Sequence, residues 1–166
     1  MLEKRYDQIT VQEIVDRADV GRSTFYANFR DKEAVLVGEF EQVLDLVHRQ
    51  QGSTGTGGAV LLPSLALFRH VRDQDALYRA LVRGHGVETL YVAGHRYLST
   101  RVEQRLAMLA CGDTNPSLPL PLLAAHLAST FFSLLRWWVD GGMVQSPEQM
   151  DRYFQQLTVP VVRTVV

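Results

Sequence analysis

The sequence predicts an all-α protein, and three observations support that prediction. Apolar residues recur at the three- and four-residue spacing of a helix face, first between Val11 and Ala18. Two helix starts carry capping boxes, one at Thr10 and one at Ser146. No stretch alternates apolar and polar residues with the period of two that a half-buried strand requires. We therefore expect a small helical head followed by a helical body.

Composition narrows the class of protein. The chain has 166 residues, of which 46% are hydrophobic, so it can bury a sizeable core. Its formal net charge is −1, which counts against binding of nucleic acid by bulk charge. Cys111 is the single cysteine, so an intrachain disulfide and a cysteine-based zinc site are excluded. We expect a reducing, cytoplasmic compartment and no signal peptide.

Two short helices joined by a tight turn are predicted near the start of the chain. The first covers Val11 to Ala18, and Gly21 is expected to supply the backbone angles of the turn. The second, from Arg22 to Phe29, places Phe25 and Phe29 on one side. The other side presents hydroxyls, an amide and a guanidinium, as suits a DNA groove; these side chains are Arg22, Ser23, Thr24, Tyr26 and Asn28.

This stretch carries a family resemblance. Its most specific part is the spacing Thr24-Phe25-Tyr26-x-x-Phe29-x-x-Lys32-Glu33-x-x-Leu36. With the helix before it, this resembles the helix-turn-helix signature of TetR-type (TetR/AcrR) transcriptional regulators. The resemblance implies a ligand-responsive, homodimeric DNA-binding regulator that is not an enzyme, most simply a repressor released from its operator by a small hydrophobic effector.

Candidate DNA contacts follow from base chemistry and from the resemblance. Arg22 suits guanine, Asn28 suits adenine, and Ala27 suits a thymine methyl group, whereas Ser23 and Thr24 suit bases or phosphates. The resemblance adds three phosphate contacts, at Thr10, Tyr26 and Lys32. An ordinary solvated helix face is the alternative interpretation of the same residues.

The start of the chain departs from the family pattern. Little precedes Ile9, so we expect most of the family's first head helix to be missing. The alternative function is therefore a helical, dimeric ligand-binding or interaction protein that has lost DNA binding.

The remaining helices divide the chain into two predicted domains. Asp31 is expected to cap a connecting helix that runs to about Gln50, which completes a head of residues 1–50. Residues 51–166 form an effector-binding and dimerisation domain that opens on a Gly- and Ser-rich linker. Pro160 is expected to kink or end the last helix. The body helices are predicted at Leu61 to Val71, Asp75 to Arg83, Val87 to Ala110, Leu122 to Val139, and from Ser146 onward.

The resemblance also implies an effector pocket and a dimer interface in the body. Pocket candidates are aromatic and histidine side chains, each of which also fits an ordinary core or surface position: His70, Tyr78, His85, Tyr91, His95, His126 and Phe131. The adjacent Trp137 and Trp138 should point in different directions, one to the core and one to a partner or solvent. Interface candidates lie on the last two helices: Leu127, Phe131, Leu134, Trp138, Phe154 and Leu157.

Other classes of function find little support in the sequence. No nucleophile elbow, HExxH motif or clustered acidic pair is present, so we expect no catalytic residues, no metal and no cofactor. The apolar stretch from Leu118 to Val139 is interrupted by prolines, His126 and Arg136, so we expect a core helix and not a membrane span.

Overall fold

The structure is a computed structural model that describes residues 6–52, 61–82, 86–110 and 116–166. Over these ranges it is helical and contains no strand, so the all-α prediction is confirmed. The elements, in order, are a 3-10 turn η1 (Tyr6–Gln8) and helices α1 (Val11–Ala18), α2 (Arg22–Asn28), α3 (Lys32–Gly52), α4 (Ser64–Asp73), α5 (Asp75–Val82), α6 (Gly86–Leu109), α7 (Leu120–Asp140) and α8 (Pro147–Val165).

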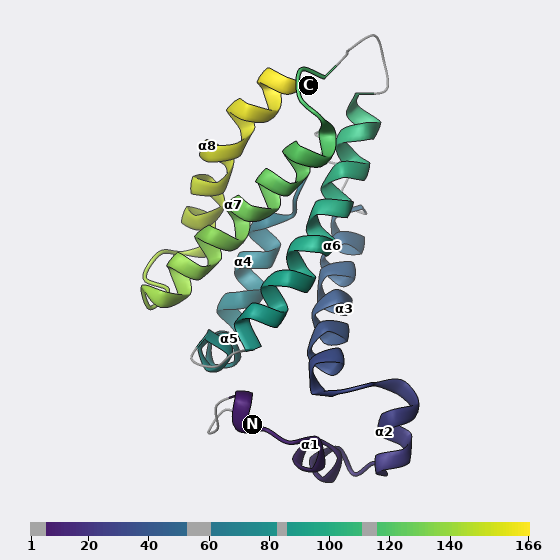
Figure 1. Cartoon of the computed structure of the whole chain (residues 1–166). Coiled ribbons are helices and arrows are strands. Elements are labelled where there is room, and N and C mark those ends of the chain that lie inside the picture. Colours follow the sequence, from purple (N-terminus) through teal and green to yellow (C-terminus); the bar gives the residue numbers. More distant parts are fainter. Residues whose placement is uncertain (1–5, 53–60, 83–85, 111–115) are drawn as a thin grey trace.

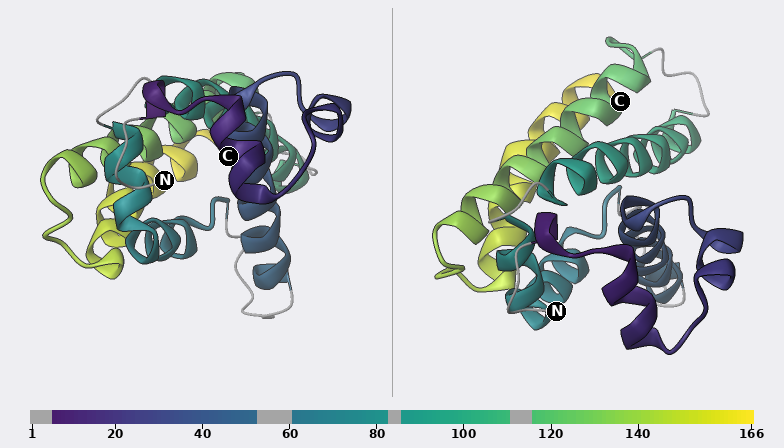
Figure 2. Two further views of the ribbon diagram at one scale, coloured as in Figure 1. Left: turned by 90° about the horizontal axis from the view of Figure 1, so that it is seen from below. Right: turned by 60° about the horizontal axis from the view of Figure 1, so that its bottom comes forward.

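The head lies at one end of the helical body. Figure 1 shows η1, α1 and α2 below the body, with α3 rising from the head alongside α6. Helices α7 and α8 form the opposite side, and α4 packs against α8. Figure 2 shows η1 beside α5, on the far side of α1 from α2. The arrangement therefore presents α2 at the outer edge of the molecule.

The predicted helix caps at Thr10, Ser146 and Asp31 are confirmed. Thr10 Oγ1 accepts a hydrogen bond from the Glu13 N–H at 3.2 Å, and the Glu13 carboxylate accepts one from the Thr10 N–H at 2.9 Å. Ser146 and Gln149 form the same reciprocal box. Asp31 Oδ1 accepts from the Ala34 N–H at 2.8 Å, and that bond holds the Asp31 pKa below its usual value.

The turn between α1 and α2 does not use its glycine as predicted. Asp19, not Gly21, takes the left-handed conformation, with φ 53° and ψ 46°. Aspartate tolerates this region better than most residues because its short polar side chain bonds locally. Gly21 is extended, with φ −69°, and precedes α2 as its N-cap residue.

The core of the body is built around Trp138, which is fully buried. Its ring meets the Phe68 ring edge-on at 5.6 Å, and Phe68 contacts Phe131 at 5.0 Å. The Trp138 indole N–H donates to the Gln145 carbonyl at 3.0 Å, and Arg72 donates to the same oxygen at 2.7 Å. These contacts join α4, α7 and the turn before α8 in one cluster.

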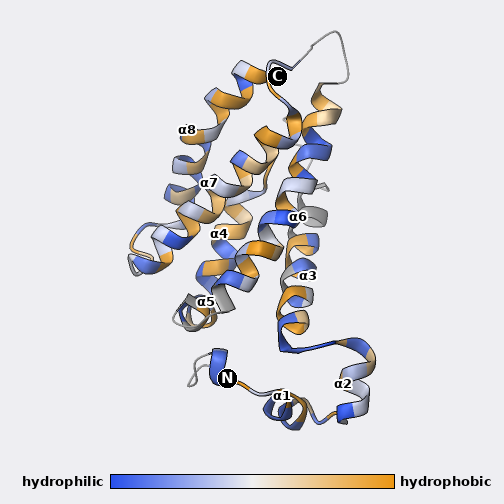
Figure 3. Ribbon diagram, viewed as in Figure 1, coloured by the Kyte–Doolittle hydropathy of each residue, from blue (hydrophilic) through white to orange (hydrophobic). Residues whose placement is uncertain are grey.

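Helix α7 supplies the largest share of that core. Its buried residues are Leu123, Ala124, Leu127, Ala128, Phe131, Phe132, Leu135, Trp138 and Val139. Among the described helices it alone has the length and hydropathy of a membrane span, although half of that window is buried inside the protein. Figure 3 shows apolar bands along α3 and α7 separated by hydrophilic residues, as amphipathic helices have. The burial of α7 is that of a core helix.

Two details of the predicted helices differ in the structure: the start of α4, and Pro160, which does not end the last helix. Helix α4 begins at Ser64, three residues later than predicted, and Pro63 is its N-cap residue instead of part of its first turn. Helix α8 continues through Pro160 to Val165. Pro160 is exposed and so is Gln156, whose carbonyl loses its helical donor, so water can satisfy that carbonyl.

Truncation of the central indole should destabilise the body strongly. We expect Trp138→Ala to lower the free energy of unfolding by about 3–5 kcal/mol, because the site cannot collapse around a fully buried ring. Urea denaturation followed by circular dichroism measures the change. Val144→Ala is the control: Val144 is 81% exposed, and its truncation should change stability by less than about 0.5 kcal/mol.

Candidate nucleic-acid interface

Helix α2 exposes the face that the sequence analysis selected. Phe25 is 5% exposed, whereas Tyr26 is 57% exposed. The other exposed residues of α2 are Arg22, Ser23, Thr24, Ala27 and Asn28. One apolar anchor and a continuous polar face are what a helix needs to lie against another surface.

Aromatic contacts hold α2 in place. Phe25 meets Phe29 with ring centroids 5.8 Å apart, and Tyr26 stands edge-on to Phe25 at 5.2 Å. Phe29 lies against Gly38 of α3, where an added Cβ would be 3.8 Å from the Phe29 ring. The α2 orientation is therefore set by the connecting helix as well as by α1.

The predicted DNA-contacting side chains differ in whether they already form hydrogen bonds within the protein. Arg22 forms no ion pair with any described residue, so its donors are available. Asn28 already donates from Nδ2 to the Thr24 carbonyl at 2.9 Å, so a bidentate contact with adenine requires that bond to open. The Thr10 hydroxyl is held in the capping box with Glu13.

Lys32 is placed differently from the prediction. Its Nζ donates to the carbonyls of Tyr6 at 3.1 Å, Asp7 at 3.3 Å and Ile9 at 2.9 Å. The same ammonium lies 4.8 Å from the centre of the Tyr6 ring. An ammonium has three donors, and here all of them point into the protein. In the structure Lys32 therefore binds the backbone of the segment before α1, and its ammonium does not point outward as the predicted phosphate contact requires.

Tyr6 is one of the residues that Lys32 contacts, and no pattern in the sequence predicted this contact. Burial, with Glu33 and Asp31 nearby, raises the Tyr6 pKa to about 12. Its hydroxyl is buried and has no hydrogen-bond partner among the described residues. Lys32 is 26 residues away from Tyr6 in the sequence, so no local spacing could have revealed the contact.

The structure places four of the predicted effector residues in two pairs of contacting rings. His70 stacks edge-on with Tyr78 at 6.1 Å, and burial lowers the His70 pKa. Tyr91 and His95, which both lie on α6, stack with ring centroids 5.7 Å apart. His95 is held by the Ser129 hydroxyl at 2.9 Å. Phe131 belongs to the core, His126 is exposed on α7, and His85 lies outside the described residues.

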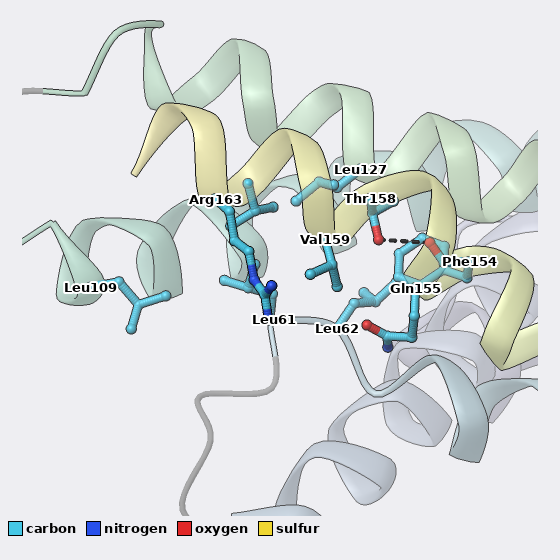
Figure 4. A pocket seen from close by; sticks show the side chains of 10 residues that line it. Leu61, Leu62, Leu109, Leu127, Phe154, Gln155, Thr158, Val159 and Arg163 are labelled. Atoms are coloured by element: carbon cyan, nitrogen blue, oxygen red, sulfur yellow. Dashed lines mark hydrogen bonds between the residues drawn. The ribbon is translucent and has the colours of Figure 1, made fainter.

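A cavity exists elsewhere in the body, and none of those candidates lines it. We call it the α8 cavity; its volume is about 350 Å³. Figure 4 shows it between α8, the segment before α4 and the end of α6. Its lining includes Leu61, Leu62, Leu109, Leu127, Phe154 and Arg163. Residues so far apart in sequence carry no common pattern, so sequence reasoning could not assemble them.

Four of the residues that were predicted to lie in the dimer interface are buried inside the single chain. Leu127, Phe131, Trp138 and Phe154 are each no more than 3% exposed within a single chain. The apolar stripe of α7 is used to cover its own subunit, so it cannot also meet a partner. Leu134 is half-buried, whereas Leu157 is 55% exposed. Trp137 is 54% exposed, so the two tryptophans do divide between core and surface, with Trp137 outward.

The residues that the structure describes contain no group of three or more His, Cys, Asp or Glu side chains that could hold a metal ion.

Comparison with known proteins shows which family has this arrangement of helices. The family model described as "Transcriptional regulator C-terminal region" matches residues 64–159, which is more than half of the chain. The model described as "Bacterial regulatory proteins, tetR family" matches residues 1–37. The chain belongs to the TetR family of bacterial transcriptional regulators. The first match spans most of α4 to α8 of this TetR-family protein, and the second ends within α3.

A solved structure shares the TetR-family fold of this chain. It is "Dihydroxyacetone kinase operon activator DhaS", with a TM-score of 0.60 and 14% sequence identity. The match covers 99% of this chain and 90% of that one. At that identity the likeness shows the fold alone. No curated protein matches the chain by sequence.

Loss of the Lys32 charge should loosen the start of the head. We expect Lys32→Gln to lower stability by about 1–2 kcal/mol, since three hydrogen bonds to a charged donor are lost from a partly buried site. Amide hydrogen exchange should speed up in the Tyr6–Ile9 segment. Arg30→Gln is the matched control: Arg30 is 90% exposed and pairs only with its neighbour Asp31, so the effect should stay below about 1 kcal/mol.

Proposed function

We propose that this TetR-family regulator binds its operator as a homodimer through α2 and is released by a small hydrophobic effector, most simply as a repressor. The observation that carries the proposal is the α2 surface: Phe25 and Phe29 anchor the helix while its polar face is open. Two such helices would enter successive major grooves of a near-palindromic site. Bound DNA would meet the exposed residues of α2, which are Arg22, Ser23, Thr24, Tyr26, Ala27 and Asn28.

Dimerisation is supported by what α7 and α8 leave uncovered. Trp137 and Leu122 are more than half exposed on α7, as is Leu157 on α8, where Tyr153 is 39% exposed. These large apolar side chains occur on two consecutive helices at the end of the chain. A two-fold axis would bring the same surface of each copy together and remove it from water.

The link between head and body supports ligand response. Asp45 on α3 accepts hydrogen bonds from the Tyr97 hydroxyl and from Arg101 Nη2, the latter at 2.8 Å. Burial, followed by the Asp45 contact, raises the Tyr97 pKa. Tyr97 and Arg101 are both on α6, so a shift of α6 would move α3 and the head with it. Such a shift would lower operator affinity if the effector favours the moved state.

We propose a head of residues 1–50, including the connecting helix, and an effector-binding and dimerisation body of residues 51–166. The matched families are transcription regulators, and a regulatory role in the cytoplasm fits an operator partner. A dimeric ligand-binding protein that does not bind DNA is the alternative, and direct DNA-binding measurements separate the two.

DNA binding is tested by gel shift and footprinting on the DNA that flanks the gene. We expect a protected near-palindrome with wild-type protein. Arg22→Gln should weaken binding by about 1–3 kcal/mol and relax the base preference at one position of the operator, because a contact with guanine is lost. Lys32→Gln should leave the slope of log K against log salt nearly unchanged, because its ammonium is already held by backbone carbonyls.

Tyr26→Ala completes this series. Removing an exposed phenol on α2 should weaken binding to all sequences alike. If wild-type protein binds no flanking fragment at low salt, the alternative function replaces the proposal.

Self-association is tested by sedimentation of the whole chain. Leu157→Glu places a charge in the proposed contact and should raise the dimer dissociation constant by at least about tenfold. Val92→Glu is the control, because Val92 is 64% exposed on α6, away from the proposed contact. A similar loss in both variants, or none with Leu157→Glu, would exclude this interface.

A further inference from the structure

The α8 cavity is open to solvent on one side, and largely buried apolar residues form its floor. Leu62, Leu127 and Phe154 are each no more than 3% exposed, yet they border an open volume of about 350 Å³. The side-chain hydroxyl of Thr158 donates to the Phe154 carbonyl at 2.7 Å, so it does not seek a partner in the cavity. Water that lies against these apolar side chains is released when an apolar ligand takes its place, and that release favours binding. The floor therefore favours an apolar occupant.

One polar side chain of the lining is already engaged. Gln155 donates from Nε2 to Ser64 Oγ at 3.4 Å and to Asp151 Oδ1 at 3.5 Å. Ser64 in turn donates to Asp151, which fixes the start of α4 against α8. These bonds hold the wall of the cavity in position. Because Gln155 is already bonded, the apolar floor is the part of the cavity that would contact the hydrocarbon portion of a ligand.

The rim carries a single charge, that of Arg163. Among the residues that line the cavity it is the only ionisable one, and it is exposed. No described carboxylate lies within ion-pair distance of it, whereas Arg69 pairs with Glu148 at 2.9 Å and Arg101 pairs with Asp45 at 2.8 Å. Figure 4 shows its side chain reaching down from α8 beside Leu61, with Leu109 of α6 standing apart from it. A guanidinium at the mouth of an apolar cavity is suited to a carboxylate.

We propose that the α8 cavity binds an amphipathic carboxylate, with its hydrocarbon chain on the Leu62, Leu127 and Phe154 floor and its carboxylate on Arg163. At about 30 Å³ for each water-sized group, 350 Å³ holds roughly a dozen non-hydrogen atoms. A medium-chain fatty acid of roughly eight to twelve carbons has that size and that distribution of charge.

The position of the cavity connects its occupant to the head. Leu109 lines the cavity at the end of α6, and Tyr97 and Arg101 on the same helix hold Asp45 of α3. A ligand that touches α6 and α8 together would stabilise one spacing of these helices. The use of the site as the effector site rests on the proposed function, whereas the binding of a carboxylate does not.

Isothermal titration of the whole chain with octanoate tests the site. We expect saturable binding of one octanoate per chain, with octan-1-ol weaker and octyltrimethylammonium weakest, since only octanoate can pair with Arg163. Arg163→Gln should weaken octanoate binding roughly tenfold and leave octan-1-ol unchanged. Arg152→Gln is the matched control: Arg152 is an exposed arginine of α8 outside the cavity, and octanoate binding should not change.

A second variant guards against misfolding of the first. Val159 is half-buried on the cavity wall, so Val159→Trp should fill the space and abolish binding of octanoate and octan-1-ol alike. Circular dichroism should show an unchanged helical spectrum for each variant. Equal affinity for octyltrimethylammonium, or unchanged octanoate affinity in both Arg163→Gln and Val159→Trp, would overturn the proposed site.

Gel shifts with the same ligand separate the site from the function. Release of the operator by octanoate, lost in Arg163→Gln, supports both. Saturable octanoate binding with the DNA complex unaffected leaves the site standing and overturns its effector role. Operator binding by a chain that fails to bind octanoate in titration leaves DNA binding standing and overturns the site.

Discussion

Burial of one stripe of α7 is the constraint on which the rest of the structure depends. Leu127, Phe131 and Trp138 fill the space between α4, α6 and α8, and Arg72 and Gln145 close it from outside. Side chains committed to this core cannot meet a second subunit. What remains for a partner is the outward face, with Trp137 and Leu157 as its largest apolar residues.

The head follows a different principle, because it is too small to bury much. Phe25 and Phe29 anchor α2, and the Lys32 ammonium binds the backbone before α1 at three carbonyl oxygens. In these contacts the two phenyl rings and the Lys32 ammonium are bound within the head itself. The groups left free are those of the α2 surface, and Arg22 is the cation among them without an ion-pair partner in the described chain. The contacts that hold the head together therefore leave the polar side chains of α2 exposed to solvent.

Helix α3 connects the head to the body. Leu44 of α3 is buried in the core of the body, and Asp45 accepts hydrogen bonds from Tyr97 and Arg101 of α6. Helix α6 ends at the α8 cavity, where Leu109 forms part of the wall. One helix therefore contacts both the cavity and the helix that leads from α2 into the body.

The sequence by itself determined the features that depend on neighbours within about one helical turn. The capping boxes at Thr10 and Ser146, the aromatic anchor of α2 and its polar face were all predictable because their partners are three or four residues away. Only the tertiary structure decided which tryptophan is buried, since both fit an apolar helix and the packing of α4 selects Trp138. It alone decided that Lys32 turns to carbonyls more than twenty residues away and that Leu61 and Arg163 share a cavity. Such contacts depend on how the helices pack, and no local pattern of residues encodes that packing.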